Sequence, residues 1–213
     1  THQDALFKLG LHELKEREFL KAIEYSQQGL ESNPVNVSLL SVLAQAHLAL
    51  KQYKAAVPEF EKLVNLGQGN EFVHSRLGFS YYQLSEYEKA IKHYNEALTF
   101  ENRNSDTHYN LGKLYALTGE LEKSEEHLIN AINIKMQPVD AEFLSLGLTY
   151  KLQKDYKNAL EYFDKSLQHN PENERALYER AVAADNYFKD LQSKIDYYQA
   201  YLNKYESSGT DGM

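Results

Sequence analysis

Apolar residues along the chain recur at the spacing of an amphipathic α-helix, and short polar stretches separate one run from the next. Residues 71–104 show the pattern clearly, with one apolar run before the polar stretch 83–86 and a second run after it. The apolar positions of the second run follow the i, i+3, i+4, i+7 rule: Tyr87, Ala90, Ile91, Tyr94, Ala97 and Leu98. The sequence shows no strand-type alternation, and its four prolines and ten glycines leave little material for hairpin turns. The pattern predicts pairs of helices and an all-α fold.

The same pattern returns every 34 or 35 residues, so the chain is a series of copies. Small residues mark one position on the first helix of each copy: Gly10, Ala44, Gly78, Gly112, Gly147 and Ala181. A second set of small residues follows twelve or so positions later: Ala22, Ala56, Ala90, Ser124 and Ala159. Small residues let the two helices of a pair approach closely, and one pair alone cannot bury both of its apolar faces. The pairs must therefore stack, and the sequence predicts a helical solenoid with a continuous core.

This unit resembles the tetratricopeptide repeat family, whose 34-residue helix-turn-helix repeat carries small and aromatic residues at these places. The segment HYNLGKLYALTGELEKS at residues 108–124 is close to the general pattern of that family. The resemblance implies an all-α, right-handed superhelical solenoid of about six antiparallel helix-turn-helix repeats. We expect one array over residues 1–206 and a flexible tail at 207–213. The repeats are expected at residues 3–36, 37–70, 71–104, 105–139, 140–173 and 174–206.

Two repeats depart from the family pattern in ways that affect structure. Pro58 falls inside a second helix, where it removes one backbone hydrogen bond and is expected to kink the helix. The sixth repeat fits only if one residue is inserted in its turn, which puts Lys194 where alanine is expected. The sixth repeat is therefore the weakest match.

Charge and composition limit the classes of partner and the environment. The net charge of −8 and the lack of a concentration of Lys and Arg disfavour nucleic acid and anionic membrane surfaces. No apolar run approaches the roughly 18–20 residues of a membrane-spanning helix, and the first residues, THQDALFKLG, lack the features of a signal peptide. We therefore expect a soluble protein without membrane insertion, in the cytoplasm or the bacterial periplasm. The compartment is undecided because the chain begins with Thr, and a signal peptide could have been removed.

No motif in the sequence predicts catalysis or a bound cofactor. The chain has no cysteine, phosphate-binding loop, dinucleotide fingerprint or nucleophile elbow. His74 and His108 are 34 residues apart, as are His93 and His127, and the repeat accounts for both spacings as equivalent positions in neighbouring units. We expect no metal site, no cofactor and no enzymatic activity.

The resemblance implies a binding surface on the concave side of the array, which the first helices of the repeats line. Aromatic side chains beside cations would supply apolar anchors and hydrogen-bond donors for a peptide. The residues expected there are Phe72, Arg76, Phe79, Tyr109, Asn110, Lys113, Lys151 and Tyr178. The lysine and asparagine set with which some members of the family grip the acidic tails of chaperones is missing, because Asn110 alone matches it in the middle of the array.

The last helix, near residues 190–206, carries an apolar stripe that no later helix covers: Leu191, Ile195, Tyr198, Tyr201, Leu202 and Tyr205. Solenoids normally end with a polar outer face, so we expect a further segment or a second copy of the chain to cover this stripe. The sequence thus predicts a non-catalytic scaffold that binds a protein or peptide in its groove. Two other readings stay open: a self-associating structural module and, with less support, a metal-dependent enzyme domain.

Overall fold

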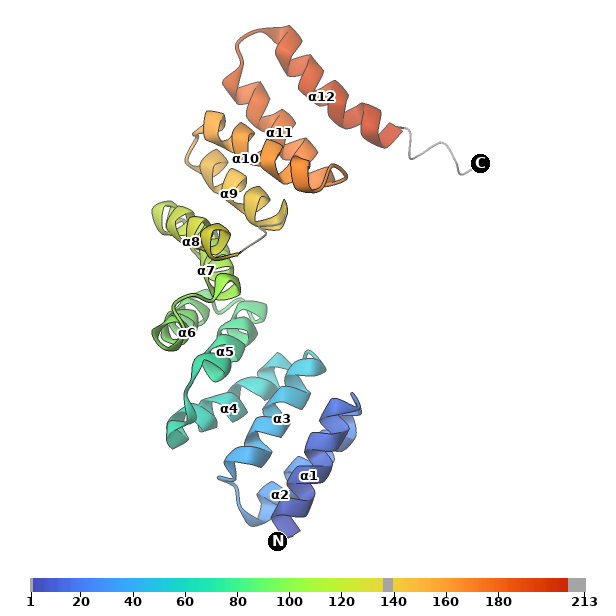
Figure 1. The fold of residues 1–213 in the computed structure, drawn as a ribbon, viewed down its shortest axis with the longest axis vertical. Coiled ribbons are helices and arrows are strands. Elements are labelled where there is room, and N and C mark those ends of the chain that lie inside the picture. The colour runs from blue at the N-terminus through green and yellow to red at the C-terminus, as the bar shows by residue number, and fades with distance from the viewer. Residues whose placement is uncertain (1, 136–139, 207–213) are drawn as a thin grey trace, which may run out of the picture. The chain divides into compact units, whose positions relative to one another are not determined.

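The computed structural model describes residues 2–135 and 140–206, and this part of the chain contains α-helices and no strand (Figure 1). The helices are α1 (His2–Lys15), α2 (Phe19–Ser32), α3 (Val37–Ala49), α4 (Tyr53–Leu63), α5 (Glu71–Gln83), α6 (Tyr87–Phe100), α7 (Ser105–Thr118), α8 (Leu121–Ile134), α9 (Asp140–Leu152), α10 (Tyr156–His169), α11 (Glu174–Tyr187) and α12 (Leu191–Glu206). A five-residue π-helical turn, η1 (Val64–Gln68), extends α4. The all-α repeat fold predicted from the apolar spacing is confirmed. None of the helices in the described residues is long and apolar enough to cross a membrane.

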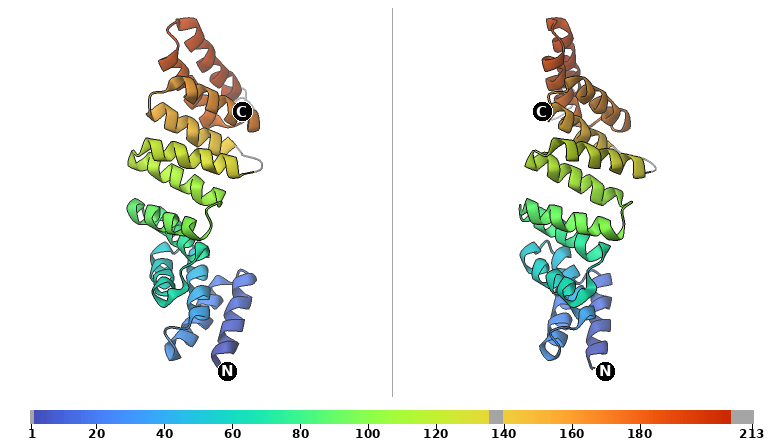
Figure 2. Two further views of the ribbon diagram at one scale, coloured as in Figure 1. Left: turned by 60° about the vertical axis from the view of Figure 1, so that its left-hand side comes forward. Right: turned by 90° about the vertical axis from the view of Figure 1, so that its left-hand side faces the viewer.

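The chain divides into two compact units, residues Thr1–Arg103 with α1 to α6 and Asn104–Met213 with α7 to α12. Each unit consists of three antiparallel helix pairs stacked one on the next (Figure 2). The six pairs match the six expected repeats, and the boundary between the units falls after the third. A single array over residues 1–206 remains a prediction, and the expected tail at 207–213 lies outside the described residues.

The small residues of the repeat lie where a first helix meets its own second helix. A methyl group added at Gly78 would lie 2.8 Å from the Tyr94 ring, and one added at Gly147 would lie 2.7 Å from the ring of Phe163. Both rings are buried in the core, so the helices approach this closely only because no Cβ intervenes. The close approach inferred from the sequence is confirmed.

Asparagine begins four of the six first helices, in the same way each time. The Oδ1 atoms of Asn36, Asn70, Asn104 and Asn173 accept hydrogen bonds from the backbone N–H three residues later, at 2.9–3.2 Å. Each bond satisfies one of the N–H groups that a helix start leaves without a partner. These four Asn residues are therefore the N-caps of α3, α5, α7 and α11.

A left-handed residue closes the turn inside five of the six repeats. Its φ is 66° at Arg17, 58° at Lys51, 61° at Ser85, 82° at Gly119 and 63° at Lys154. In each turn the next residue donates its N–H to the carbonyl five positions earlier, as Asp155 does to Tyr150 at 2.9 Å. Only the fourth repeat has the glycine that suits this conformation. The sixth repeat lacks the left-handed residue: Phe188 is extended, with φ −80° and ψ 144°, at the turn where the sequence required an insertion.

Replacing Lys154 with glycine is expected to raise the free energy of unfolding by about 0.5–1 kcal/mol, because a side chain at positive φ carries a steric cost that glycine avoids. The matched substitution Gly119→Ala should lower it by about 1 kcal/mol for the opposite reason. Urea unfolding followed by circular dichroism measures both changes. Equal shifts of the same sign in the two variants would show that the left-handed conformation is not under strain.

Pro58 lies inside α4, as the sequence placed it, and the helix continues from Tyr53 to Leu63 around it. The π-helical turn that follows ends near Gly67, whose φ is 72°. The second repeat therefore reaches the third by an irregular connection over residues 64–70 that includes the π-helical turn.

Candidate functional site

In the first unit, three predicted groove residues form a stripe along α5. Phe72, Arg76 and Phe79 are spaced i, i+4 and i+7, so they share one face of the helix. Phe72 and Arg76 are exposed, and Phe79 is half-buried. The guanidinium carbon of Arg76 lies 5.0 Å from the centre of the Phe72 ring, within cation–π range. The stripe therefore places a cation between two aromatic rings.

Helix α4 supports both ends of this stripe. Phe72 packs edge-on against buried Phe60, with ring centres 6.5 Å apart, and Phe79 packs edge-on against Tyr53 at 5.8 Å. These contacts fix the two rings on the surface before any partner arrives. Fixed aromatic anchors lose little conformational entropy on binding.

Tyr53 also lines an open hollow of about 420 Å³ beside the turn between α3 and α4. Its lining residues are Lys51, Gln52, Tyr53, Lys54, Ala55 and Leu84. The sequence did not indicate this hollow, since its walls come from the turn before α4, the first turn of α4 and the residue after α5 rather than from one helical stripe. We call the stripe and the hollow together the α5 surface.

The cations of the α5 surface are available to a partner. Within the described residues, Lys51, Lys54 and Arg76 form no ion pair, although acidic side chains outnumber basic ones in the chain as a whole. An unpaired cation beside apolar surface can hold a carboxylate without first giving up an internal partner. The α5 surface is thus locally basic in an acidic protein.

In the second unit, Tyr109, Asn110 and Lys113 share a face of α7, and all three are half-buried. The Lys113 ammonium lies 5.3 Å from the centre of the Tyr109 ring, and Tyr109 packs against the core between α8 and α10. The structure therefore brings these three predicted residues together, but with less exposed apolar area than at the α5 surface.

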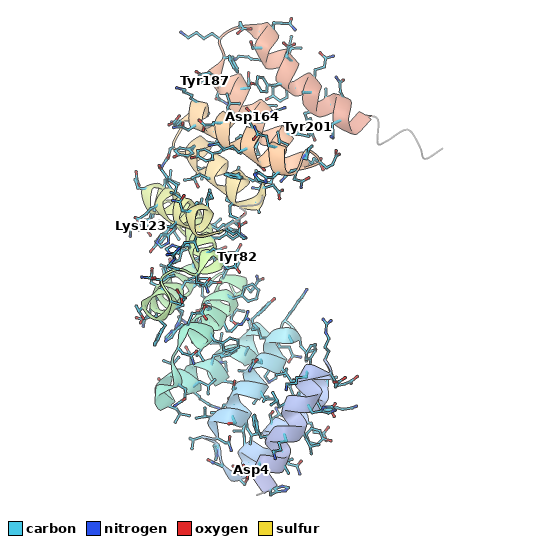
Figure 3. All side chains as sticks on the ribbon, in the orientation of Figure 1. Asp4, Tyr82, Lys123, Asp164, Tyr187 and Tyr201 are labelled. Atoms are coloured by element: carbon cyan, nitrogen blue, oxygen red, sulfur yellow. The ribbon has the colours of Figure 1, made fainter. Side chains whose placement is uncertain are left out.

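Two other predicted groove residues have surroundings that the sequence did not reveal. Lys151 donates a hydrogen bond to Glu179 of α11, so its charge is already paired inside the unit. Tyr178 is exposed and stacks edge-on with Tyr201 of α12 at 5.7 Å, beside an open hollow of about 560 Å³ that also involves Asn173, Glu174 and Arg175. Tyr178 was predicted in the groove and Tyr201, which is labelled in Figure 3, in a separate interface, yet their rings are in contact.

The predicted stripe on α12 is divided between two faces of the helix. Tyr201 points toward α11, where its hydroxyl donates to Glu174 at 3.3 Å. Leu191, Ile195 and Leu202 are exposed, and Tyr198 is half-buried beside them. The exposed stripe therefore consists of Leu191, Ile195, Tyr198 and Leu202 and omits Tyr201. The side chain of Tyr205 lies outside the described part of the molecule.

The histidines form contacts that the sequence did not indicate. His74 and His93 meet across one helix pair with 3.1 Å between their Nδ1 atoms, and His108 and His127 meet in the same way at 3.0 Å. The 34-residue spacing therefore repeats a histidine pair instead of separating single histidines. Among the described residues no group of three or more metal-ligating side chains occurs. One hydrogen bond between the two imidazoles explains why the histidines of each pair lie together.

Both histidine pairs belong to columns of stacked rings. Tyr81 stacks on His93 at 5.5 Å and Tyr115 lies on His127 at 5.4 Å. Burial lowers the pKa of His93 and that of His127 to about 4, and it also lowers the pKa of His74. These imidazoles are therefore neutral at pH 7.

Sequence profiles of one repeat family match much of the chain. Profiles described as "Tetratricopeptide repeat" match residues 7–71, 105–136 and 141–173, and one described as "TPR repeat" matches residues 78–119. No curated protein matches the chain at a significant level.

Solved structures with the same fold cover most of the chain. YrrB, described as a TPR protein with an unusual peptide-binding site, is 20% identical over 81% of this chain and 89% of its own, with a TM-score of 0.76. A MamA protein is 24% identical over 80% of this chain and 93% of its own, with a TM-score of 0.74. The C-terminal part of a TPR repeat-containing protein from Cytophaga hutchinsonii is 17% identical over 95% of this chain and 80% of its own, with a TM-score of 0.81. Because these repeat profiles together match most of the chain and the helix pairs follow the family's spacing, the chain belongs to the tetratricopeptide repeat family.

Proposed function

We propose that the chain is a non-catalytic scaffold that binds an acidic peptide segment with apolar side chains at the α5 surface. The tetratricopeptide repeat fold generally mediates protein–protein interaction. The observation that carries the proposal is the stripe on α5 in which exposed Arg76 lies between exposed Phe72 and half-buried Phe79. A partner's carboxylate would meet Arg76, while its apolar side chains would cover the two rings.

The hollow beside Tyr53 adds further basic and apolar surface, which suits the same acidic and apolar peptide. Lys51 and Lys54 lie at its edge, and Leu84 and Ala55 supply apolar wall. If the peptide carries a second acidic residue next to an apolar one, these two residues would therefore bind at the hollow. YrrB, which shares the fold, supports peptide binding as a use of such an array.

Selection of a displayed random-peptide library against the whole chain tests this function. Peptides that are retained should be enriched in Asp or Glu next to Phe, Tyr or Leu. Arg76→Glu should weaken a retained peptide at least tenfold, about 1.4 kcal/mol or more of binding free energy, because it replaces attraction by repulsion at the centre of the surface. The melting temperature should stay nearly unchanged, since Arg76 is exposed.

Lys157→Glu is the matched control, because Lys157 is exposed on α10, carries the same charge and forms no ion pair within the described residues. It should leave binding unchanged. Equal losses in the two variants would mean that net charge alone governs binding, and unchanged binding in Arg76→Glu would place the site elsewhere. Lys113→Glu reports separately on the second unit, where loss of binding would assign the peptide to α7 instead.

A further inference from the structure

The anchors of the α5 surface lie on one face of a single helix, so helix geometry fixes the intervals between them. Phe72, Arg76 and Phe79 follow one another at i, i+4 and i+7. Since an α-helix rises about 1.5 Å per residue, Arg76 lies about 6 Å from Phe72 along the axis, and Phe79 lies about 4.5 Å beyond Arg76. A partner that covers both rings and reaches Arg76 therefore presents three side chains on one face at the same two intervals.

Contacts with α4 hold these intervals in place. The Phe72 ring packs against Phe60 and the Phe79 ring packs against Tyr53, so both rings of α5 rest on rings of α4. The guanidinium of Arg76 lies over the Phe72 ring, with its central carbon 5.0 Å from the ring centre. Moving either ring along α5 would break a contact with α4. The spacing of the anchors therefore discriminates between partners of different backbone conformation.

Among the regular backbone conformations, the α-helix reproduces these intervals. On a β-strand, side chains of one face follow at about 6.6 Å, so three of them span about 13 Å. On a polyproline II helix, side chains of one face recur at about 9.3 Å, and none lies on that face between them. On an α-helix, residues i, i+4 and i+7 share a face at intervals of about 6 and 4.5 Å. The stripe on α5 thus matches a helical partner and mismatches both extended forms.

The hollow continues the match at the end of α5. Leu84, which lines the hollow, is five residues after Phe79 and so lies about 7.5 Å further along the axis. The next position on the same face of a partner helix, i+11, lies about 6 Å beyond i+7. Tyr53 contacts Phe79 and also lines the hollow, so one face of the partner can cover both. Lys51 and Lys54 then meet acidic residues near the i+11 end of that helix.

We propose, building on the function proposed above, that the ligand of the α5 surface is an acidic amphipathic α-helix that lies along α5. Its apolar residues stand at i, i+7 and i+11 and its acidic residue at i+4; a helix of the opposite direction has apolar residues at i, i+4 and i+11 and the acidic residue at i+7. The acidic side chain then lies next to apolar ones on the helix surface, although three or four positions separate them in sequence. Arg76, Lys51 and Lys54, which form no ion pair within the described residues, select an acidic helix over a basic one.

Fluorescence anisotropy with synthetic peptides of one composition, titrated with the whole chain, tests the proposal. Two helix-spaced peptides carry the pattern in its two directions, and a strand-spaced peptide carries the same apolar and acidic residues at every second position. One of the helix-spaced peptides should bind at least tenfold more tightly than the strand-spaced one. A proline midway along its outer face should weaken it at least tenfold, because proline breaks the helix, whereas alanine there should not. The helical circular dichroism of the peptide should rise on binding.

The variant Arg76→Glu separates failure of the helix from failure of the site. It should weaken the tighter helix-spaced peptide at least tenfold, and Lys157→Glu should leave that peptide unaffected. If the strand-spaced peptide binds as tightly, or the proline has no effect, while Arg76→Glu still weakens binding, the ligand is extended and only the helical form is overturned. If none of the peptides binds, or if their binding does not depend on Arg76, the site at the α5 surface is overturned and the helix with it.

Discussion

Replacing Gly147 with alanine is expected to lower the free energy of unfolding by about 2 kcal/mol, the usual cost of forcing one extra carbon into a packed core. The new Cβ would lie 2.7 Å from Cδ1 and Cε1 of Phe163. The Phe163 ring is completely buried and is packed among Leu128, Leu146 and Leu160, so it cannot turn aside without displacing them. The added atom must therefore separate α9 from α10.

Gly10→Ala is the matched control, because Gly10 is the residue equivalent to Gly147 in the first repeat. The nearest atoms to its Cβ would be Ser26 Oγ at 3.3 Å, Val42 Cγ1 at 3.4 Å and the carbonyl oxygen of Ala22 at 3.6 Å. The better helix propensity of alanine, roughly 0.5–1 kcal/mol, should offset that crowding and leave stability nearly unchanged. Urea unfolding of the two variants gives the comparison. Equal changes in both would mean that backbone propensity, not the space around the Cβ, decides the residue at this position.

The same two glycines show what the sequence could and could not predict. They belong to the series of small residues whose spacing of 34 or 35 residues identified the repeat and the helix pair, because the approach of two adjacent helices depends on residues close together in the chain. The sequence did not indicate which glycine is irreplaceable. That depends on the side chain opposite, Phe163 in one repeat and Ser26 in another, and on how far that side chain can move.

For the candidate site, too, the sequence predicted which residues share a helix face but not which residues pair with a neighbouring helix. The helical spacing together with the family resemblance placed Phe72, Arg76 and Phe79 on one face of a first helix, and the structure has them on one face of α5. The sequence could not show that Lys151 is paired with Glu179, because the partner lies in the next repeat and depends on side-chain direction. It also separated Tyr178 from Tyr201, which belong to different helices and meet only when α12 folds back on α11.

Acidification from pH 7 to pH 4 is expected to destabilise the chain through its histidine pairs. Burial holds the pKa of His93 and that of His127 at about 4 in the folded chain, against 6.5 for an unperturbed histidine. The unfolded chain therefore binds protons first, and stability falls as the pH drops below 6.5. Above pH 6.5 the folded and unfolded chains bind equal numbers of protons at these sites. Below about pH 4 the loss is complete.

Charged side chains around each histidine pair change the pKa values further, but they do not reverse the loss of stability at low pH. Next to His93, the coulombic effects of His74 and Lys92 lower the pKa further, while Glu61 and Glu96 raise it. Next to His127, His108 and Lys123 lower the pKa and Glu126 raises it. His93 and His127 remain partly exposed to solvent, so we expect about 1–2 kcal/mol of lost stability for each pair, well below the full value of the pKa shift.

The fifth repeat supplies the control for this prediction, because it has the same column of rings without a histidine pair. Phe143 and Tyr162 occupy the places of His108 and His127, with ring centres 6.4 Å apart, and Tyr162 stacks on Tyr150 at 5.3 Å. The double variant His108→Phe with His127→Tyr should therefore keep the packing and lose the proton uptake. Carboxylates protonate in both proteins, so they cancel in the comparison.

Chemical unfolding of the natural chain and of this double variant between pH 7.5 and pH 4 measures the effect. The difference in their free energies of unfolding should be constant above pH 6.5 and should then shift in favour of the variant by about 1–2 kcal/mol as the pH falls to 4. A difference that does not change with pH would mean that the pair accepts a proton without cost, for example by keeping the Nδ1–Nδ1 hydrogen bond in the charged form. In that case the paired histidines would be a packing element alone, interchangeable with Phe143 and Tyr162 of the fifth repeat at any pH.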